Sequence, residues 1–169
     1  GILKPLAIAC KKLKPGEILE EEYPLLWALG CAWEEYCASF YPGMDYQPGG
    51  VALNGIHGTA DGISLDPKYG TVVEEFKFTF KGERSDLPHR LAADSKLKKF
   101  SDEWMWQHQG RAYCKLYNAV VVRWHVCHVR GDYKSFGPIY KRYTFEFSKK
   151  EVQQTWDMLK GNKELAVPE

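Results

Sequence analysis

Residues 58–77, GTADGISLDPKYGTVVEEFK, predict a β-hairpin around which the rest of the chain has to pack. Proline and glycine lie in the turn at residues 66–70, so we expect one strand over residues 59–65 and a second over residues 71–80. Because side chains alternate along a strand, the second strand has two different faces. The face expected in the core carries Val72, Phe76, Phe78 and Phe80, and the opposite face carries Val73, Glu75, Lys77 and Thr79.

The opposite face places the Glu75 carboxylate beside the Lys77 ammonium group, and Asp61 on the first strand can approach both. Carboxylate oxygens bind Mg²⁺ and Mn²⁺ well, and such an ion lowers the pKa of a water molecule and offsets charge on a phosphate. A nearby lysine can orient that water. These side chains therefore favour a metal-dependent phosphodiesterase. The alternative is a surface ion pair, which would contribute at most about 1 kcal/mol to stability.

Asp61-Gly62 followed by Glu75-Phe76-Lys77 resembles the PD-(D/E)XK nuclease superfamily. Ala60 replaces the proline that usually precedes the aspartate, but that proline only stiffens the turn and takes no part in the chemistry. The resemblance implies an α/β fold with a mixed central β-sheet flanked by helices. It also implies that Asp61, Glu75 and the main-chain carbonyl of Phe76 bind the metal ion, while Lys77 positions the attacking water.

The chain of 169 residues predicts one domain, with a core over residues 24–160 and a peripheral arm over residues 1–22. A net charge of +1 excludes a uniformly basic nucleic-acid-binding protein, so DNA contacts have to come from a local patch. Five cysteines without a CxxC pair argue against a disulfide framework and fit a reducing cytosol. We see no signal peptide or membrane-spanning run and expect a cytoplasmic protein, in a bacterial host if a phage encodes it.

Residues 24–40 predict a helix, because Pro24 suits a first turn and the proline and glycine at 42–43 would stop it. Glu34 falls on the apolar side of this helix, where a carboxylate is costly unless it is paired or binds a metal ion. Gly30 and Glu34 match the GxxxE motif of RecB-like and lambda-exonuclease-like nucleases. This resemblance implies that Glu34 is a further acid at the metal site. The alternative is a glutamate that reaches solvent.

Residues 101–117 predict a second helix on which Gln109 and Tyr113, four residues apart, share one face. They match the QxxxY motif of RecB-like nucleases, in which both residues line the active-site groove and help to hold DNA. The preceding residues 81–100 contain six Lys or Arg and three acids, and we expect a loop beside the site. The alternative for this loop is an ordinary solvated segment. The expected phosphate contacts are Arg84, Arg90, Lys96, Lys98 and Lys99.

The remaining segments complete an alternation of helices and strands. We expect strands over residues 51–56, 119–130 and 138–147, with His57 in the loop after the first. His125 and His128 are three apart, so a strand would place them on opposite faces and they form no metal pair. A capping box at residues 148–151 begins a last helix, which we expect to end at Gly161.

Taken together, these motifs are most similar to small phage-type exonucleases related to lambda exonuclease and RecB. The resemblance implies a Mg²⁺- or Mn²⁺-dependent DNA exonuclease of recombination or repair that acts on linear DNA ends. It allows a homo-oligomer such as a toroidal trimer, and a single-strand annealing protein as a partner. The alternatives are a structure-specific or nicking endonuclease and a non-catalytic DNA-binding module. No iron–sulfur cluster is expected, because the cysteine spacing does not match those of cluster-containing relatives.

Overall fold

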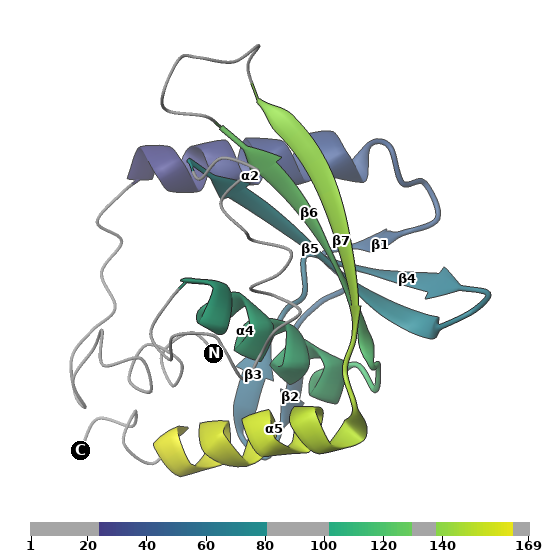
Figure 1. Ribbon diagram of the computed structural model, residues 1–169, viewed down its shortest axis with the longest axis vertical. Coiled ribbons are helices and arrows are strands. Elements are labelled where there is room, and N and C mark those ends of the chain that lie inside the picture. The colour runs from purple at the N-terminus through teal and green to yellow at the C-terminus, as the bar shows by residue number, and fades with distance from the viewer. Residues whose placement is uncertain (1–23, 81–101, 130–137, 164–169) are drawn as a thin grey trace.

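A five-stranded mixed β-sheet forms the centre of the molecule (Figure 1). The computed structural model describes residues 24–80, 102–129 and 138–163. The strand order is β1-β4-β5-β6-β7, in which β5 and β6 are parallel and the other neighbours are antiparallel. The mixed central sheet predicted from the sequence is therefore confirmed. The strands are β1 (Asp45–Tyr46), β4 (Gly62–Asp66), β5 (Gly70–Thr79), β6 (Val121–His128) and β7 (Ile139–Glu146).

Helices cover both faces of this sheet (Figure 1). On one face lies α2 (Pro24–Ala38), whose Trp33 donates a hydrogen bond of 3.1 Å to the backbone carbonyl of His125 on β6. On the other face lies α4 (Asp102–Leu116), and α5 (Lys149–Lys163) packs against α4. Gly110 brings α4 close to the sheet, because a Cβ there would lie 2.9 Å from the Trp124 ring. The core of the molecule is therefore the layer between α4, α5 and the sheet. It lies on the Val73 face of β5 and not on the Val72 and Phe76 face that the sequence predicted, because α4 and α5 both pack on that side; α2 covers the other face, so both valines are buried.

A small separate hairpin consists of β2 (Val51–Leu53) and β3 (Ile56–Gly58). The prediction of a single strand over residues 51–56 was wrong, because Asn54 and Gly55 form the turn. Their φ angles of 53° and 71° are those of a two-residue hairpin turn, for which Asn-Gly is the preferred sequence. The Asn54 side chain also accepts a hydrogen bond of 3.2 Å from Trp156 on α5. His57, expected in a loop, lies on β3 and is exposed.

Two further expectations need correction at the ends of elements. Helix α5 continues through Gly161 to Lys163, since that glycine has a helical neighbourhood and no left-handed φ. Phe80 is 53% exposed and not part of the core, because β5 ends at Thr79 and the chain has left the sheet. The capping box at the start of α5 is confirmed: Ser148 N–H donates to Glu151 Oε2 at 2.8 Å.

The predicted separation of the two histidines of β6 is confirmed. His125 Nδ1 lies 2.8 Å from the Tyr140 hydroxyl, and His128 Nε2 lies 3.0 Å from the Tyr143 hydroxyl. Tyr140 and Tyr143 are three residues apart on β7, so they too lie on opposite faces of the sheet. Within the described ranges, no helix is both long enough and apolar enough to cross a membrane. Cys37, Cys114 and Cys127 have free thiols. The expected arm at residues 1–22 lies outside the described residues.

Candidate functional site

The edge of β5 beyond Glu74 is the place where the predicted acids meet. Strand β4 begins at Gly62, whose partner in the ladder is Glu74, so the following residues of β5 have no partner on β4. Asp61 takes this place, and its Oδ2 accepts a hydrogen bond of 2.7 Å from the backbone N–H of Phe76. Because the N–H and C=O of a strand residue point to the same edge, the Phe76 carbonyl also faces this side. Two of the predicted metal ligands therefore lie at one strand edge.

Glu75 and Lys77 lie together on the α4 face of β5, as the alternation predicts. Lys77 Nζ lies 2.8 Å from Glu75 Oε2, and the two side chains are 15% and 0% exposed. The other carboxylate oxygen, Glu75 Oε1, is buried and has no hydrogen-bond partner among the described residues. A buried acceptor without a donor costs about 1–3 kcal/mol, and more when it is charged. The Glu75 carboxylate is thus only half satisfied by the protein.

Burial and neighbouring charge make the ionised form of Glu75 unfavourable. Its pKa is raised to about 8, first by burial and then by the negative charge of Asp61, against the opposing effect of Lys77. Burial alone would lower the pKa of Lys77, but the charges of Glu75 and Asp61 outweigh it and raise that pKa. Lys77 therefore stays a cation, while negative charge on Glu75 calls for further positive charge at the site.

Glu34 on α2 belongs to the same electrostatic cluster. Its side chain is half-buried, whereas the neighbouring Glu35 is exposed, as the helix geometry predicts. The pKa of Glu34 is raised to about 7, by burial first and next by the charge of Asp61, while Lys77 lowers it. The structure therefore brings Glu34 near Asp61 and Lys77, where the GxxxE resemblance implied it would be.

Gln109 and Tyr113 on α4 lie on the same face of β5 as Glu75 and Lys77. Gln109 Nε2 donates a hydrogen bond of 3.3 Å to the Tyr113 hydroxyl. The pKa of Tyr113 is raised by burial and by the charge of Glu75, and Lys77 opposes this. Gly58 allows β3 to approach Tyr113 closely, because a Cβ at this position would lie 2.8 Å from the Tyr113 ring. The two residues of the QxxxY motif thus act as one pair beside Glu75.

The oxygen atoms of this site fit a divalent cation that keeps most of its bound water molecules. Within the described residues, no group of three or more His, Cys, Asp or Glu side chains is already arranged to hold a metal ion. The observation that favours a cation is the orphaned Glu75 Oε1, buried beside the Asp61 charge. Mg²⁺ commonly binds through one or two carboxylates, and Asp61, Glu75, Glu34 and the Phe76 carbonyl offer hard oxygen donors.

Two residues near the predicted site were missed from the sequence. Tyr46 lies on β1 opposite Gly62, and its pKa is raised by burial and by the charges of nearby acids, Glu34 first. A two-residue strand gives no signal in the sequence. Glu74 is 4% exposed on the α2 face. Its signal was present, because alternation places this acid between Val72 and Phe76 on the face assigned to the core.

The proposed phosphate contacts are not located. Arg84, Arg90, Lys96, Lys98 and Lys99 all lie in residues 81–101, outside the described residues. They stay a prediction.

Two solved structures of other proteins are similar to this fold. No protein-family profile and no curated protein matches the chain. The crystal structure of a phage-related exonuclease from Haemophilus somnus 129PT is similar, with a TM-score of 0.57 and 10% identity over 97% of this chain and 78% of that one. The crystal structure of SSO0001 has a TM-score of 0.52 and 14% identity over 86% of this chain. This chain spans only 63% of SSO0001. The fold is therefore nuclease-like.

Proposed function

We propose that this protein is a Mg²⁺- or Mn²⁺-dependent DNA exonuclease of the PD-(D/E)XK type. The observation that carries the proposal is the buried Glu75 carboxylate, which has one oxygen on Lys77 and the other without a donor, beside Asp61. A buried carboxylate oxygen without a donor calls for an explanation such as a bound ion, and the Asp61 charge beside it favours a cation. The fold shared with a phage-related exonuclease supports a nuclease of this general kind.

In this proposal Asp61, Glu75 and the Phe76 carbonyl hold the cation, and Glu34 binds it directly or through water. When bound, the cation lowers the pKa of the attacking water and offsets negative charge on the phosphate. Lys77 is fixed on Glu75 Oε2 and kept protonated, so it would be placed to orient that water by hydrogen bonding.

The substrate is the end of a linear DNA molecule. Gln109 and Tyr113 would hold the strand, since the amide and the hydroxyl are already joined and lie beside Glu75. The basic side chains of residues 81–101 would contact the phosphates. A homo-oligomer, such as a trimer, and a single-strand annealing protein are the proposed partners.

The test is digestion of end-labelled linear DNA beside covalently closed circular DNA, with Mg²⁺, with Mn²⁺ or with EDTA. We expect release of label from linear DNA with either metal, survival of the circles, and no reaction in EDTA. Rapid linearisation of the circles would instead indicate an endonuclease. Absence of any cleavage with both metals, on single-stranded and double-stranded DNA, would leave a non-catalytic DNA-binding module.

A further inference from the structure

An aromatic pocket lies between α2 and β7, on the face of the sheet opposite to Glu75. Its volume is about 370 Å³, within the range of small-ligand sites. None of the side chains that line it is charged. Its floor includes the thiols of Cys37 and Cys127. Its walls are the rings of Trp33, Tyr36, Phe40, Tyr41 and Tyr140.

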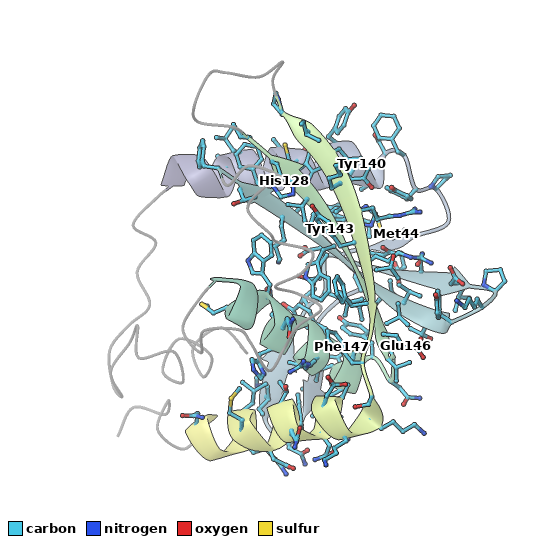
Figure 2. The ribbon with its side chains drawn as sticks, in the orientation of Figure 1. Met44, His128, Tyr140, Tyr143, Glu146 and Phe147 are labelled. Carbon is cyan, nitrogen blue, oxygen red and sulfur yellow. The ribbon has the colours of Figure 1, made fainter. Side chains whose placement is uncertain are left out.

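The walls of this aromatic pocket are held in place yet open to solvent. The Trp33 indole is fixed by its hydrogen bond to the His125 carbonyl, and its ring lies 5.8 Å from those of both Tyr36 and Tyr140. Tyr140 lies on β7 where that strand passes α2 (Figure 2). Tyr36 and Phe40 are 58% and 62% exposed. Rigid aromatic faces left in contact with water on one side of a pocket favour a flat ligand that stacks on them.

One edge of the aromatic pocket is polar. The hydroxyls of Tyr41 and Tyr140 lie 2.8 Å apart, and the Tyr140 hydroxyl lies 2.8 Å from His125 Nδ1. His125 Nε2 in turn lies 2.8 Å from Glu74 Oε2, so a buried chain holds the hydroxyl pair. Hydroxyl groups both donate and accept hydrogen bonds. Flat apolar walls with one uncharged edge of this kind match a nucleobase, whose ring stacks and whose edge carries donors and acceptors.

A positive charge lies beside the aromatic pocket. Arg142 is exposed and lies two residues beyond Tyr140, so the two side chains share one face of β7. Burial first, and then Tyr41, raise the pKa of Tyr140, and the nearby positive charge of Arg142 lowers it. A nucleotide with its base in the pocket would bring its phosphate to this rim, where an arginine complements it.

We propose that the aromatic pocket holds one unpaired nucleotide of single-stranded DNA. The base stacks on the rings, its edge meets the hydroxyls of Tyr41 and Tyr140, and a neighbouring phosphate contacts Arg142. The choice of DNA as the ligand rests on the proposed function, whereas the shape and the chemistry of the pocket do not. Aromatic platforms with an adjacent cation are the general means by which proteins bind single strands without reading their sequence.

The test measures binding of a labelled single strand of about eight nucleotides to the whole chain in EDTA, by fluorescence anisotropy. The reference ligand is an abasic strand with the same phosphates. We expect Tyr36→Ala and Phe40→Ala each to weaken binding of the base-containing strand by about 5- to 100-fold, and to leave the abasic strand nearly unchanged. Arg142→Ala should weaken both. Leu65→Ala, which removes an apolar side chain that is 82% exposed and outside the aromatic pocket, is the control.

Equal affinity of the parent for the two strands, or an unchanged affinity in both aromatic variants with native melting curves, would overturn the proposal. Tyr140→Phe keeps the ring but removes the hydroxyl, so it should retain stacking and lose any preference among the four bases. Because EDTA removes the cation, loss of the proposed nuclease activity would not affect this result. A parent that cleaves DNA but shows no base-dependent binding would refute only the aromatic pocket.

Discussion

Glu74 and Glu75 are neighbours in the sequence, but on β5 their side chains lie on opposite faces of the sheet and in different hydrogen-bonding environments. Both are buried, with 4% and 0% exposure. Glu74 has a partner for each oxygen: Ser64 and Arg123 donate to Oε1, and His125 lies 2.8 Å from Oε2. Glu75 has Lys77 on one oxygen and no described partner on the other.

The difference appears in how readily each acid ionises. Burial alone would raise the pKa of Glu74, but hydrogen bonds from His125 and Ser64 outweigh it, and the pKa lies below its ordinary value. The pKa of Glu75 is raised to about 8 by burial and by Asp61. Since residue type and burial are nearly the same, the neighbours decide the outcome: donors and positive charge lower the pKa of Glu74, whereas the negative charge of Asp61 helps to raise that of Glu75. The protein supplies hydrogen-bond partners to both oxygens of Glu74, whereas Glu75 Oε1 is left for a ligand to bind.

The largest effect expected from this contrast is the loss of DNA cleavage in Lys77→Ala. The lysine is not a metal ligand in our proposal, so the variant should lose about 10²- to 10⁴-fold in rate while DNA binding stays near that of the parent. Initial rates on end-labelled DNA, with binding measured separately in Ca²⁺ or EDTA, provide the check. Lys68→Ala, at an exposed position in the β4–β5 turn, is the matched control. A Lys77→Ala enzyme within a few-fold of the parent would remove Lys77 from the mechanism.

The next largest effect concerns stability, in the isosteric pair Glu74→Gln and Glu75→Gln. Hydrogen bonds to a charged group contribute about 1.5–3 kcal/mol, so Glu74→Gln should lower the free energy of unfolding by roughly this amount at pH 7. Glu75→Gln removes a charge that the site disfavours, while its amide oxygen can still accept from Lys77 and the charge of Asp61 still complements that lysine, so it should cost much less in the absence of metal. Urea denaturation of both variants in EDTA gives the comparison. Equal losses in the free energy of unfolding would mean that the two carboxylates do not differ in how well the protein stabilises their charge.

The pH dependence of the same pair should have opposite signs. The folded pKa of Glu74 is lowered, so its contribution is present above the unfolded pKa and is lost as pH falls through the folded one. The deficit of Glu74→Gln should therefore shrink in acid. With a folded pKa of about 8 against 4.5, native Glu75 binds more protons than the unfolded chain between these values. Stability of the parent is lost there as pH rises, so Glu75→Gln should gain relative to it from pH 5 to pH 8.

The sequence predicted the central hairpin and the α4 helix because their signals are local. A turn with proline and glycine, strict alternation and i, i+4 spacing are read within a few residues. The resemblance implied a mixed central sheet flanked by helices, but no order of the strands within it. The same local signals grouped Asp61, Glu75 and Lys77, as the structure does, since one hairpin carries all three.

Contacts between strands that are far apart in the sequence could not be predicted from these local signals. The bond between Glu74 and His125 depends on the parallel register of β5 and β6, in which Glu74 pairs with Arg123. No local pattern fixes that register. The pairing of Tyr46 with Gly62 is likewise a contact of β1 that only the folded sheet creates. The wrong prediction over residues 51–58 has a different cause, because Asn54-Gly55 is a local hairpin signal that outweighs the apparent single strand.

A cation bound at the site of Glu75 and Asp61 should stabilise the folded protein. For a dissociation constant on the order of 1 mM, about 10 mM Mg²⁺ adds roughly 1.4 kcal/mol to the free energy of unfolding. This corresponds to a rise of about 3–6 °C in melting temperature, and Mn²⁺ should do at least as well.

Asp61→Asn should raise the metal-free melting temperature slightly, because it relieves repulsion, and should reduce the shift with metal. Thermal melts at fixed ionic strength, with exposed Asp157→Asn as control, provide the measurement. An equal shift in parent and Asp61→Asn would exclude Asp61 from the site.

The smallest effect tests donor number directly, by removing one donor from Glu74. Ser64→Ala leaves Arg123 and His125 in place, so the carboxylate keeps two of its three partners. We expect a loss of about 1 kcal/mol at pH 7, which is a fall of about 2–4 °C in melting temperature. Because this hydrogen bond favours the ionised acid, the loss should diminish as Glu74 is protonated. Ser39→Ala, which removes an exposed hydroxyl at the end of α2, should show no such dependence on pH. A loss in Ser64→Ala that stays constant into acid would mean that the serine stabilises the fold through packing, and that the count of donors around Glu74 does not set its charge.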